Sequence, residues 1–171
     1  MSGTGLKLRR METADVPAVL RLERTLFPDD AWSEEMLLGE LADQPRTRHY
    51  VVAEAPGGEL IGYAGLAAAG DQADVQTIAV KPQRQGGGVG TALLTELLDE
   101  ARRRGGTEVF LEVRADNHRA RRLYEHFGFK RIGLRKGYYQ PSGVDAIVMR
   151  RRLDVTAPPH PTGSAREDQT P

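Results

Sequence analysis

Residues 85–90 read Gln-Gly-Gly-Gly-Val-Gly, a segment with almost no side chains. The apolar run 75–80 before it predicts a buried strand, and residues 89–101 carry apolar side chains at helical spacing. A helix N-terminus has free backbone N–H groups and a partial positive charge, and glycine lets an anion approach both. The order strand, glycine loop, helix therefore favours a phosphate site over a simple strand-to-helix turn.

Two common phosphate-binding patterns do not fit this segment. A P-loop has a lysine after its last glycine, whereas Thr91 follows Gly90 directly. A dinucleotide fold would place its glycines near the N-terminus, but here two helical segments and a predicted hairpin come first. The spacing Gln85-x-x-Gly88-x-Gly90 instead resembles the signature with which GNAT N-acetyltransferases bind the pyrophosphate of acetyl-CoA.

A second segment, residues 111–117 (Leu-Glu-Val-Arg-Ala-Asp-Asn) followed by Tyr124 and Phe127-Gly128-Phe129, resembles a narrower branch of that family. These are the RimI-like protein N-terminal acetyltransferases, and the resemblance covers residues 5–153. It implies transfer of acetyl from acetyl-CoA to the α-amine of an N-terminal alanine by direct attack on the thioester. The implied partner is the N-terminal segment of a small-subunit ribosomal protein.

The resemblance also implies residue roles. Glu112 would be the general base and Tyr124 the general acid. The cofactor would be bound by Ile78, Ala79, Val80, Gln85, Gly86, Gly87, Gly88, Val89, Gly90, Thr91 and Asn117, with the backbone of the first three beside the pantetheine arm. The peptide entrance would be shaped by Phe27, Pro28, Tyr138 and Tyr139. Gly87 departs from the pattern, because relatives carry a larger polar residue there.

The chemistry supports these roles independently. An α-amine has a pKa of roughly 7.7–8.0, so much of it is protonated at neutral pH, and a carboxylate at a strand end can remove that proton. A phenol can donate a proton to the departing sulfur. The residues by themselves leave plainer interpretations open: Glu112 as a solvent-facing strand residue, Tyr124 as a core tyrosine, Asn117 as a helix cap, and Tyr138 and Tyr139 as strand-flanking aromatics.

Composition limits the other possibilities. The 171 residues suit one domain, predicted over 1–153, followed by a polar, proline-rich segment 154–171 that we expect to be a disordered tail. The 24 basic and 24 acidic residues give no net charge, which argues against nucleic-acid binding. The lack of cysteine excludes a thiol nucleophile, and the four histidines lack metal-ligand spacing, so no metal is expected. No membrane span or signal peptide is visible. We expect a cytoplasmic monomer or weak dimer.

The predicted elements give an α/β domain with a mixed sheet of about seven strands and about four helices, as in the GNAT fold. The first half of the sheet is expected to be antiparallel, and the helix after the glycines should cross over to a parallel neighbour. Strands are predicted at 6–9, 49–54, 60–68, 75–80, 109–113, 130–135 and 145–152. Helices are predicted from Thr13 to Leu26, from Ser33 to Gln44, over 89–104, and from Asp116 or Asn117 to Phe127; Tyr138 and Tyr139 fall in the last loop.

Two alternatives remain open at this stage. The chain could be a GNAT enzyme that acetylates a small amine or a lysine side chain, or a non-catalytic module that binds acyl-CoA. Arg84, Arg119 and Arg121 are equal candidates for the 3′-phosphate of coenzyme A.

Overall fold

The computed structural model describes residues 5–153, and its elements follow the predicted order. Seven strands and four α-helices are present in these residues, as expected; the predicted tail 154–171 lies outside them. The elements are β1 (Lys7–Arg10), α1 (Val16–Leu26), α2 (Glu34–Ala42), β2 (Arg48–Glu54), β3 (Leu60–Ala69), β4 (Gln72–Val80), α3 (Val89–Arg103), β5 (Glu108–Arg114), α4 (His118–His126), β6 (Lys130–Tyr139) and β7 (Val144–Arg152). No helix within residues 5–153 is both long and apolar enough to cross a membrane.

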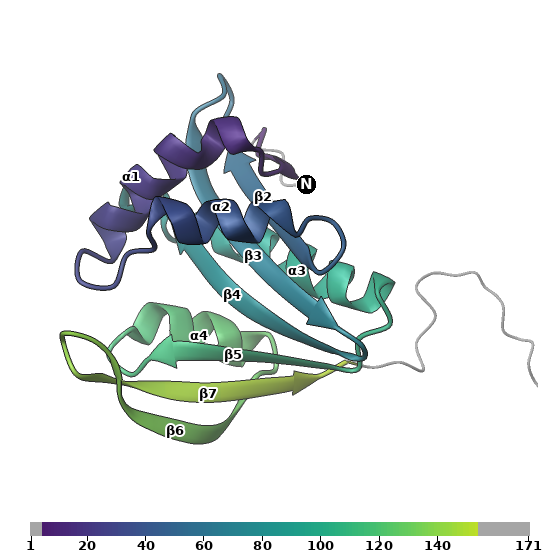
Figure 1. Ribbon diagram of the computed structural model, residues 1–171, viewed down its shortest axis with the longest axis vertical. Helices are drawn as coiled ribbons and strands as arrows, with labels where there is room; N and C mark the ends of the chain where they lie inside the picture. The colour runs from purple at the N-terminus through teal and green to yellow at the C-terminus, as the bar shows by residue number, and fades with distance from the viewer. Residues whose placement is uncertain (1–4, 154–171) are drawn as a thin grey trace, which may run out of the picture.

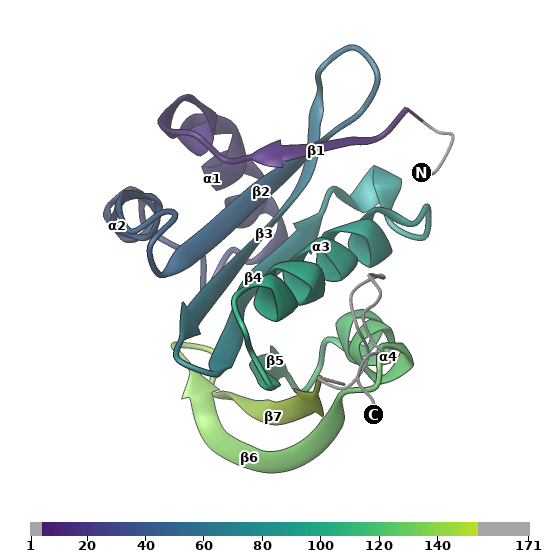
Figure 2. The ribbon, with the colours of Figure 1, turned by 90° about the vertical axis from the view of Figure 1, so that its right-hand side faces the viewer.

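All seven strands form one sheet in the order β1-β2-β3-β4-β5-β7-β6. Neighbouring strands are antiparallel except β4 and β5, which are parallel and are joined through α3. Figure 2 shows α1 and α2 on one face of the sheet and α3 on the other. The predicted GNAT fold, with its antiparallel first half and one parallel pair, is confirmed.

The parallel pair separates along its length. β4 pairs with β5 only from Gln72 to Val75, and the rest of β4 pairs only with β3 among the described strands. Gly65 lies opposite Thr77 while Leu66 lies opposite Val75, so Gln76 is an extra residue that forms a β-bulge where the two strands part. In Figure 1 the strands meet at one end and diverge at the other. The C-terminal end of β4 therefore keeps one free edge in the middle of the sheet.

Two hydrophobic clusters hold the sheet between the helices. The cluster under α3 includes the whole predicted apolar face of that helix, Val89, Leu93, Leu94, Leu97, Leu98 and Ala101. The other cluster joins α1 and α2 to β2 and β3. Each fully buried aliphatic side chain contributes about 1.5–3 kcal/mol, so α3 is firmly anchored at the position its glycine loop requires.

Three predicted boundaries are wrong. β4 begins at Gln72 rather than residue 75. Thr13 is not the helix cap: it opens a 3-10 turn, and Asp15 accepts the N–H of Glu12 at 2.8 Å. β6 continues to Tyr139 instead of ending at residue 135, because residues 136–138 bulge opposite Asp145, whose Oδ1 accepts the Gly137 N–H at 2.9 Å.

Tyr138 and Tyr139 thus belong to a strand rather than to the loop. Ser33 does cap α2, since its hydroxyl accepts the Met36 N–H at 3.1 Å. The side chain of Asn117 caps α4 in the same way, and its Oδ1 accepts the Ala120 N–H at 3.1 Å. Local side-chain capping was therefore predictable for two helices, whereas the long-range pairing of β6 was not.

Candidate functional site

The glycine segment forms an open turn at the start of α3. Gly86 and Gly88 have φ angles of +85° and +90°, a region that side chains other than glycine rarely adopt, and no atom lies within 4 Å of where their Cβ atoms would be. The first helical bond runs from the Ala92 N–H to the Gly88 carbonyl at 3.0 Å. The N–H groups of residues 89–91 therefore have no partner one turn earlier and point out of the helix end.

Gly90 has a further role that the sequence did not indicate. A Cβ atom at this position would lie 3.3 Å from Leu123 Cδ2, which is closer than most side chains tolerate. Gly90 thus allows α4 to pack against the start of α3. The close approach places the N-terminal ends of both helices beside the free edge of β4.

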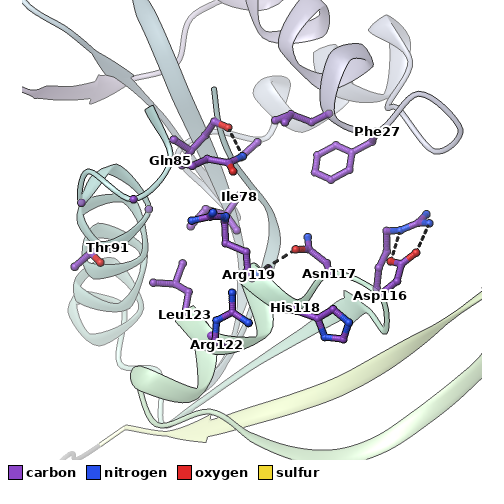
Figure 3. Close-up of a pocket in the computed structure, with 18 residues that line it drawn as sticks. Phe27, Ile78, Gln85, Thr91, Asp116, Asn117, His118, Arg119, Arg122 and Leu123 are labelled. Atoms are coloured by element: carbon purple, nitrogen blue, oxygen red, sulfur yellow. Dashed lines mark hydrogen bonds and ion pairs between the residues drawn. The ribbon is translucent and has the colours of Figure 1, made fainter. Parts of the chain in front are cut away.

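A cavity of about 870 Å³ extends from the start of α3, across the end of β4, to the start of α4 (Figure 3). Nine of the residues predicted to bind the cofactor line it: Ile78, Ala79, Val80, Gln85, Gly86, Gly88, Gly90, Thr91 and Asn117. Gly87 and Val89 do not line it, because Gly87 lies on the outside of the loop and Val89 is buried under α3. Gln85 fixes the loop by donating to the Val80 carbonyl at 3.2 Å.

The α4 side of the cavity carries positive charge. His118, Arg119 and Arg122 line it, and Figure 3 shows the two arginines rising from α4 beside Asn117. Of the three arginines considered from sequence, only Arg119 lies here; Arg121 donates to the Ala115 carbonyl at 3.2 Å, and Arg84 lies 3.7 Å from Glu59. Arg122 was missed, although its three-residue spacing from Arg119 places both on one side of a helix.

A second cavity of about 120 Å³ adjoins the first, and the two share Phe27, Ile78, Arg114, Asn117 and Ala120. Glu112, Tyr124 and Tyr139 also line it. Sequence-distant residues predicted to act together are therefore adjacent. Pro28 and Tyr138 do not line either cavity, and Tyr138 is 49% exposed.

Glu112 lies on the face of β5 opposite to the buried Leu111 and Val113. Its Oε2 is 2.5 Å from Nε of Arg135, and the hydroxyl of Tyr138 hydrogen-bonds to the same carboxylate, which raises the pKa of Tyr138. Glu112 therefore faces the small cavity with its charge compensated. Its side chain is 28% exposed, so the position is shared between the cavity and the solvent.

Two tyrosines in the small cavity keep their protons. Tyr124 is 4% exposed, and its burial raises the pKa of the phenol above the usual range. Burial likewise raises the pKa of Tyr139 to about 12. The Tyr124 ring packs edge-on against Phe129 with 5.8 Å between centroids. The phenol of Tyr124 therefore keeps its proton at neutral pH and is held in a fixed position in the wall of the cavity.

An arginine connects the two walls of the small cavity. Arg114 forms ion pairs with Asp30, between α1 and α2, and with Asp116 at 3.1 Å before α4, and it lies 5.3 Å from the Tyr139 ring centroid. Asp30 Oδ1 is buried without a hydrogen-bond partner among the described residues. No sequence pattern indicates this link, because its members are far apart in the chain.

Glu23 is a further residue that sequence reasoning missed. It lines the small cavity from α1 and is 4% exposed. Its Oε2 accepts the Trp32 N–H at 3.2 Å, and its Oε1 accepts the Tyr63 hydroxyl. Burial raises the pKa of this carboxyl to about 7.

One other cluster of possible metal ligands lies away from these cavities. His49, Glu96 and Glu100 place ligand atoms within 4.8 Å of one another. Both carboxylates are already paired, since Arg103 lies 2.9 Å from Glu96 and 2.7 Å from Glu100. The arginine accounts for this cluster as an ion-pair network.

The family model for the Acetyltransferase (GNAT) family matches residues 16–129. The chain belongs to the GNAT family. It is 47% identical over 143 residues to N-alpha-acetyltransferase RimI of Mycobacterium tuberculosis. The aligned region covers 81% of this chain and 87% of that protein. These matches confirm the family and the resemblance to RimI-like enzymes.

Solved GNAT structures agree with this assignment. The ribosomal-protein-S18-alanine N-acetyltransferase of Escherichia coli superposes with a TM-score of 0.73 at 30% identity, over 96% of this chain and 99% of that one. The protein yncA of Salmonella typhimurium, solved with its cofactor acetyl-CoA, has a TM-score of 0.73 at 25% identity, over 91% and 98%. The GNAT fold of this chain is therefore shared along nearly its full described length.

Proposed function

We propose that this GNAT acetyltransferase transfers acetyl from acetyl-CoA to the α-amine of an N-terminal alanine, and that its substrate is a ribosomal protein. The names of the relatives in Mycobacterium tuberculosis and Escherichia coli support this choice. The observation that carries it is the joining of the glycine-lined cavity to a small cavity that holds Glu112 and Tyr124.

The larger cavity fits acetyl-CoA. Its volume of about 870 Å³ is within the range of ligand pockets, roughly 300–1,000 Å³. The free N–H groups at the start of α3, beside the open space at Gly86 and Gly88, suit a pyrophosphate. The open backbone edge of residues 78–80 suits the amides of the pantetheine arm, as a neighbouring strand would. When bound there, acetyl-CoA supplies the acetyl thioester.

The smaller cavity fits a short N-terminal residue. Its volume of about 120 Å³ corresponds to roughly a few water molecules, enough for an ammonium group and a methyl. Phe27, Trp32 and Tyr139 contribute aromatic walls. A large N-terminal side chain would have to displace these rings, so the cavity favours alanine.

The residues then divide the proton chemistry. Glu112 accepts a proton from the attacking amine, and Tyr124 donates one to the departing sulfur. Both line the cavity that the amine would enter. Direct transfer needs no enzyme nucleophile, which suits a chain without cysteine.

The test is acetylation of a matched set of peptides that differ only at the first residue, analysed by fragmentation mass spectrometry. We expect α-amine acetylation of the alanine peptide and much slower reaction when leucine or phenylalanine comes first. An alanine peptide with a blocked α-amine and a free lysine serves as the control. Modification of the lysine alone, or reaction only with small polyamines, would refute the proposal.

A further inference from the structure

Glu23 is the only charged side chain among residues 5–153 that is fully buried. It lies on the face of α1 that otherwise carries Val16, Val19 and Leu20. Both of its hydrogen-bond donors, the Trp32 N–H and the Tyr63 hydroxyl, are neutral groups. Within the described part of the chain no lysine, arginine or histidine forms an ion pair with it. A carboxylate in this position costs free energy unless it pairs with a cation or takes up a proton.

Three carboxyl groups line the small cavity, and two of them have a cationic partner. Glu112 pairs with Arg135 at 2.5 Å, and Asp30 pairs with Arg114. Glu23 has none in the described residues. A compact cation entering this cavity, such as the ammonium of a peptide N-terminus, would therefore find its uncompensated counter-charge at Glu23.

The reaction itself takes two protons from the attacking nitrogen, at two different stages. The nitrogen enters as –NH3⁺ and ends as an amide N–H, so it loses two protons. The first must leave before attack, to free the lone pair, and the second must leave after the N–C bond has formed. The C–S bond then breaks, sulfur takes up one proton, and one proton is released to solvent.

We propose that Glu23 binds the α-ammonium of the substrate and removes its first proton, while Glu112 accepts the second. This inference rests on the proposed function. Glu23–COO⁻ and R–NH3⁺ become Glu23–COOH and R–NH2, and the amine lone pair forms the new bond to the acetyl carbon. Tyr124 protonates the departing sulfur and regains its proton from Glu112. Glu23 returns its proton to solvent, which leaves the net reaction balanced.

The acidity of Glu23 agrees with this geometry. Burial raises its pKa to about 7, close to the value of roughly 7.7–8.0 for an α-amine, so the transfer is nearly even. The charged and titratable groups around it come from six other parts of the fold: Tyr50 on β2, Tyr63 on β3, Asp30 between α1 and α2, both Glu112 and Arg114 on β5, Tyr124 on α4, and Tyr139 on β6. Burial keeps the phenols of Tyr50, Tyr124 and Tyr139 protonated, and the two other carboxylates are paired with arginine.

The experiment measures kcat/KM for an alanine peptide from pH 6 to pH 9.5 in the wild type and in Glu23→Gln. At pH 7 we expect a loss of about 100-fold or more, which is the usual scale for a positioned proton acceptor. At pH 9 the amine is already neutral in solution, so the variant should approach the wild type. Glu125→Gln, an exposed carboxylate on α4, removes the same charge elsewhere and should change neither value.

A purely structural role would lower kcat/KM equally at pH 7 and pH 9, and that result, or no loss at either pH, overturns the inference. Tyr63→Phe provides a second test, because it removes a donor to the charged form of Glu23. Its acidic limb should move to higher pH; an unmoved limb contradicts the inference even if Glu23→Gln fails to fold. If the wild type acetylates no α-amine, the proposed function itself fails and this inference falls with it.

Discussion

The two adjoining cavities differ in what lines them, because one presents mainly backbone groups and the other mainly side chains. The larger one presents mainly backbone groups, from the glycine turn 85–90 and the free edge of residues 78–80. The smaller one presents side chains from α1, β5, α4 and β6, among them Glu23, Glu112 and Tyr124. Binding by backbone requires only that side chains stay out of the way, whereas proton transfer requires particular side chains to meet.

The cavities also differ in the sign of their charge. The larger one has a helix N-terminus, Arg119 and Arg122, and so favours an anion. The smaller one holds three carboxyl groups, one of them without a cationic partner in the described residues, and so favours a cation. Although the chain has no net charge, its two cavities therefore favour different ligands: the larger one a phosphate-rich co-substrate, and the smaller one an ammonium group.

The largest effect should come from a charge placed in the backbone cradle. Gly88→Asp forces a side chain onto a residue with φ of +90° and puts a carboxylate against the pyrophosphate. We expect acetyl-CoA affinity to fall by about 100-fold or more, as two close negative charges near a protein surface imply. Calorimetric titration measures it.

Gly58→Asp is the matched control for this change. Gly58 has a φ of +94° in the β2–β3 turn, with open space around its Cβ position, so backbone strain and charge are the same. It should leave the affinity unaltered. Equal affinities for both variants would show that the cradle does not bind the pyrophosphate.

The next largest effect should distinguish proton transfer in the smaller cavity from cofactor binding in the larger one. Tyr124→Phe removes the proposed proton donor but keeps the ring against Phe129, so we expect kcat to fall by roughly 100-fold with an unchanged KM for acetyl-CoA. Steady-state kinetics test this. Tyr50→Phe, which removes a buried hydroxyl that donates to Glu40 at 2.8 Å, is the control and should retain full kcat. Loss of cofactor affinity in place of turnover would assign Tyr124 to the other cavity.

The third prediction concerns stability and pH. The pKa of Glu23 is raised from 4.5 to about 7 in the folded protein, so its carboxyl is favoured in the neutral form. Its contribution is fully present below pH 4.5 and is lost as pH rises through 7. As the pH rises from 4.5 to 8, the wild type should lose this contribution and Glu23→Gln should not. The free energy of unfolding of the variant relative to the wild type should therefore increase by about 3 kcal/mol over this range.

Urea unfolding at pH 4.5 and pH 8 measures this gain. Glu125→Gln again serves as the control, because its exposed carboxylate should show no such trend. A stability difference for Glu23→Gln that stays constant with pH would mean that the carboxyl is not held in an apolar environment.

The smallest effect is expected at the rim of the larger cavity. Arg119→Gln and Arg122→Gln should each weaken acetyl-CoA binding by about fivefold, as for a partly exposed ion pair, and the loss should disappear with 3′-dephospho-acetyl-CoA. Arg121→Gln is the control, since its guanidinium is bonded to the Ala115 carbonyl. Equal losses with both forms of the co-substrate would place the 3′-phosphate elsewhere.

The sequence predicted the cradle well because its signals are local. The glycines, the apolar face of α3 and the cap at Asn117 all depend on residues within a few positions of one another. The limits of β6 were wrong because a bulge opposite Asp145, in another strand, extends it. Gly87 and Val89 follow the motif but do not line the cavity, since a loop and a helix alternate the directions in which successive residues point.

Glu23 could have been noticed. Val16, Val19, Leu20 and Leu26 follow helical spacing, and residue 23 falls within that apolar stripe. The pattern indicates that a charged residue is buried, but it cannot say what the residue meets. In the folded chain it meets the Trp32 N–H and the Tyr63 hydroxyl, two neutral donors, and no cationic partner among the described residues.

The order of residues is sufficient to specify an anion-binding turn on a firmly packed helix, because backbone dihedrals and helical periodicity are local properties. Folding alone decides where β4 and β5 separate, and which carboxyl in the resulting space lacks a cation. These outcomes depend on burial and on pairing between distant segments, and the electrostatic free energy of a side chain is set by those neighbours rather than by its place in the chain.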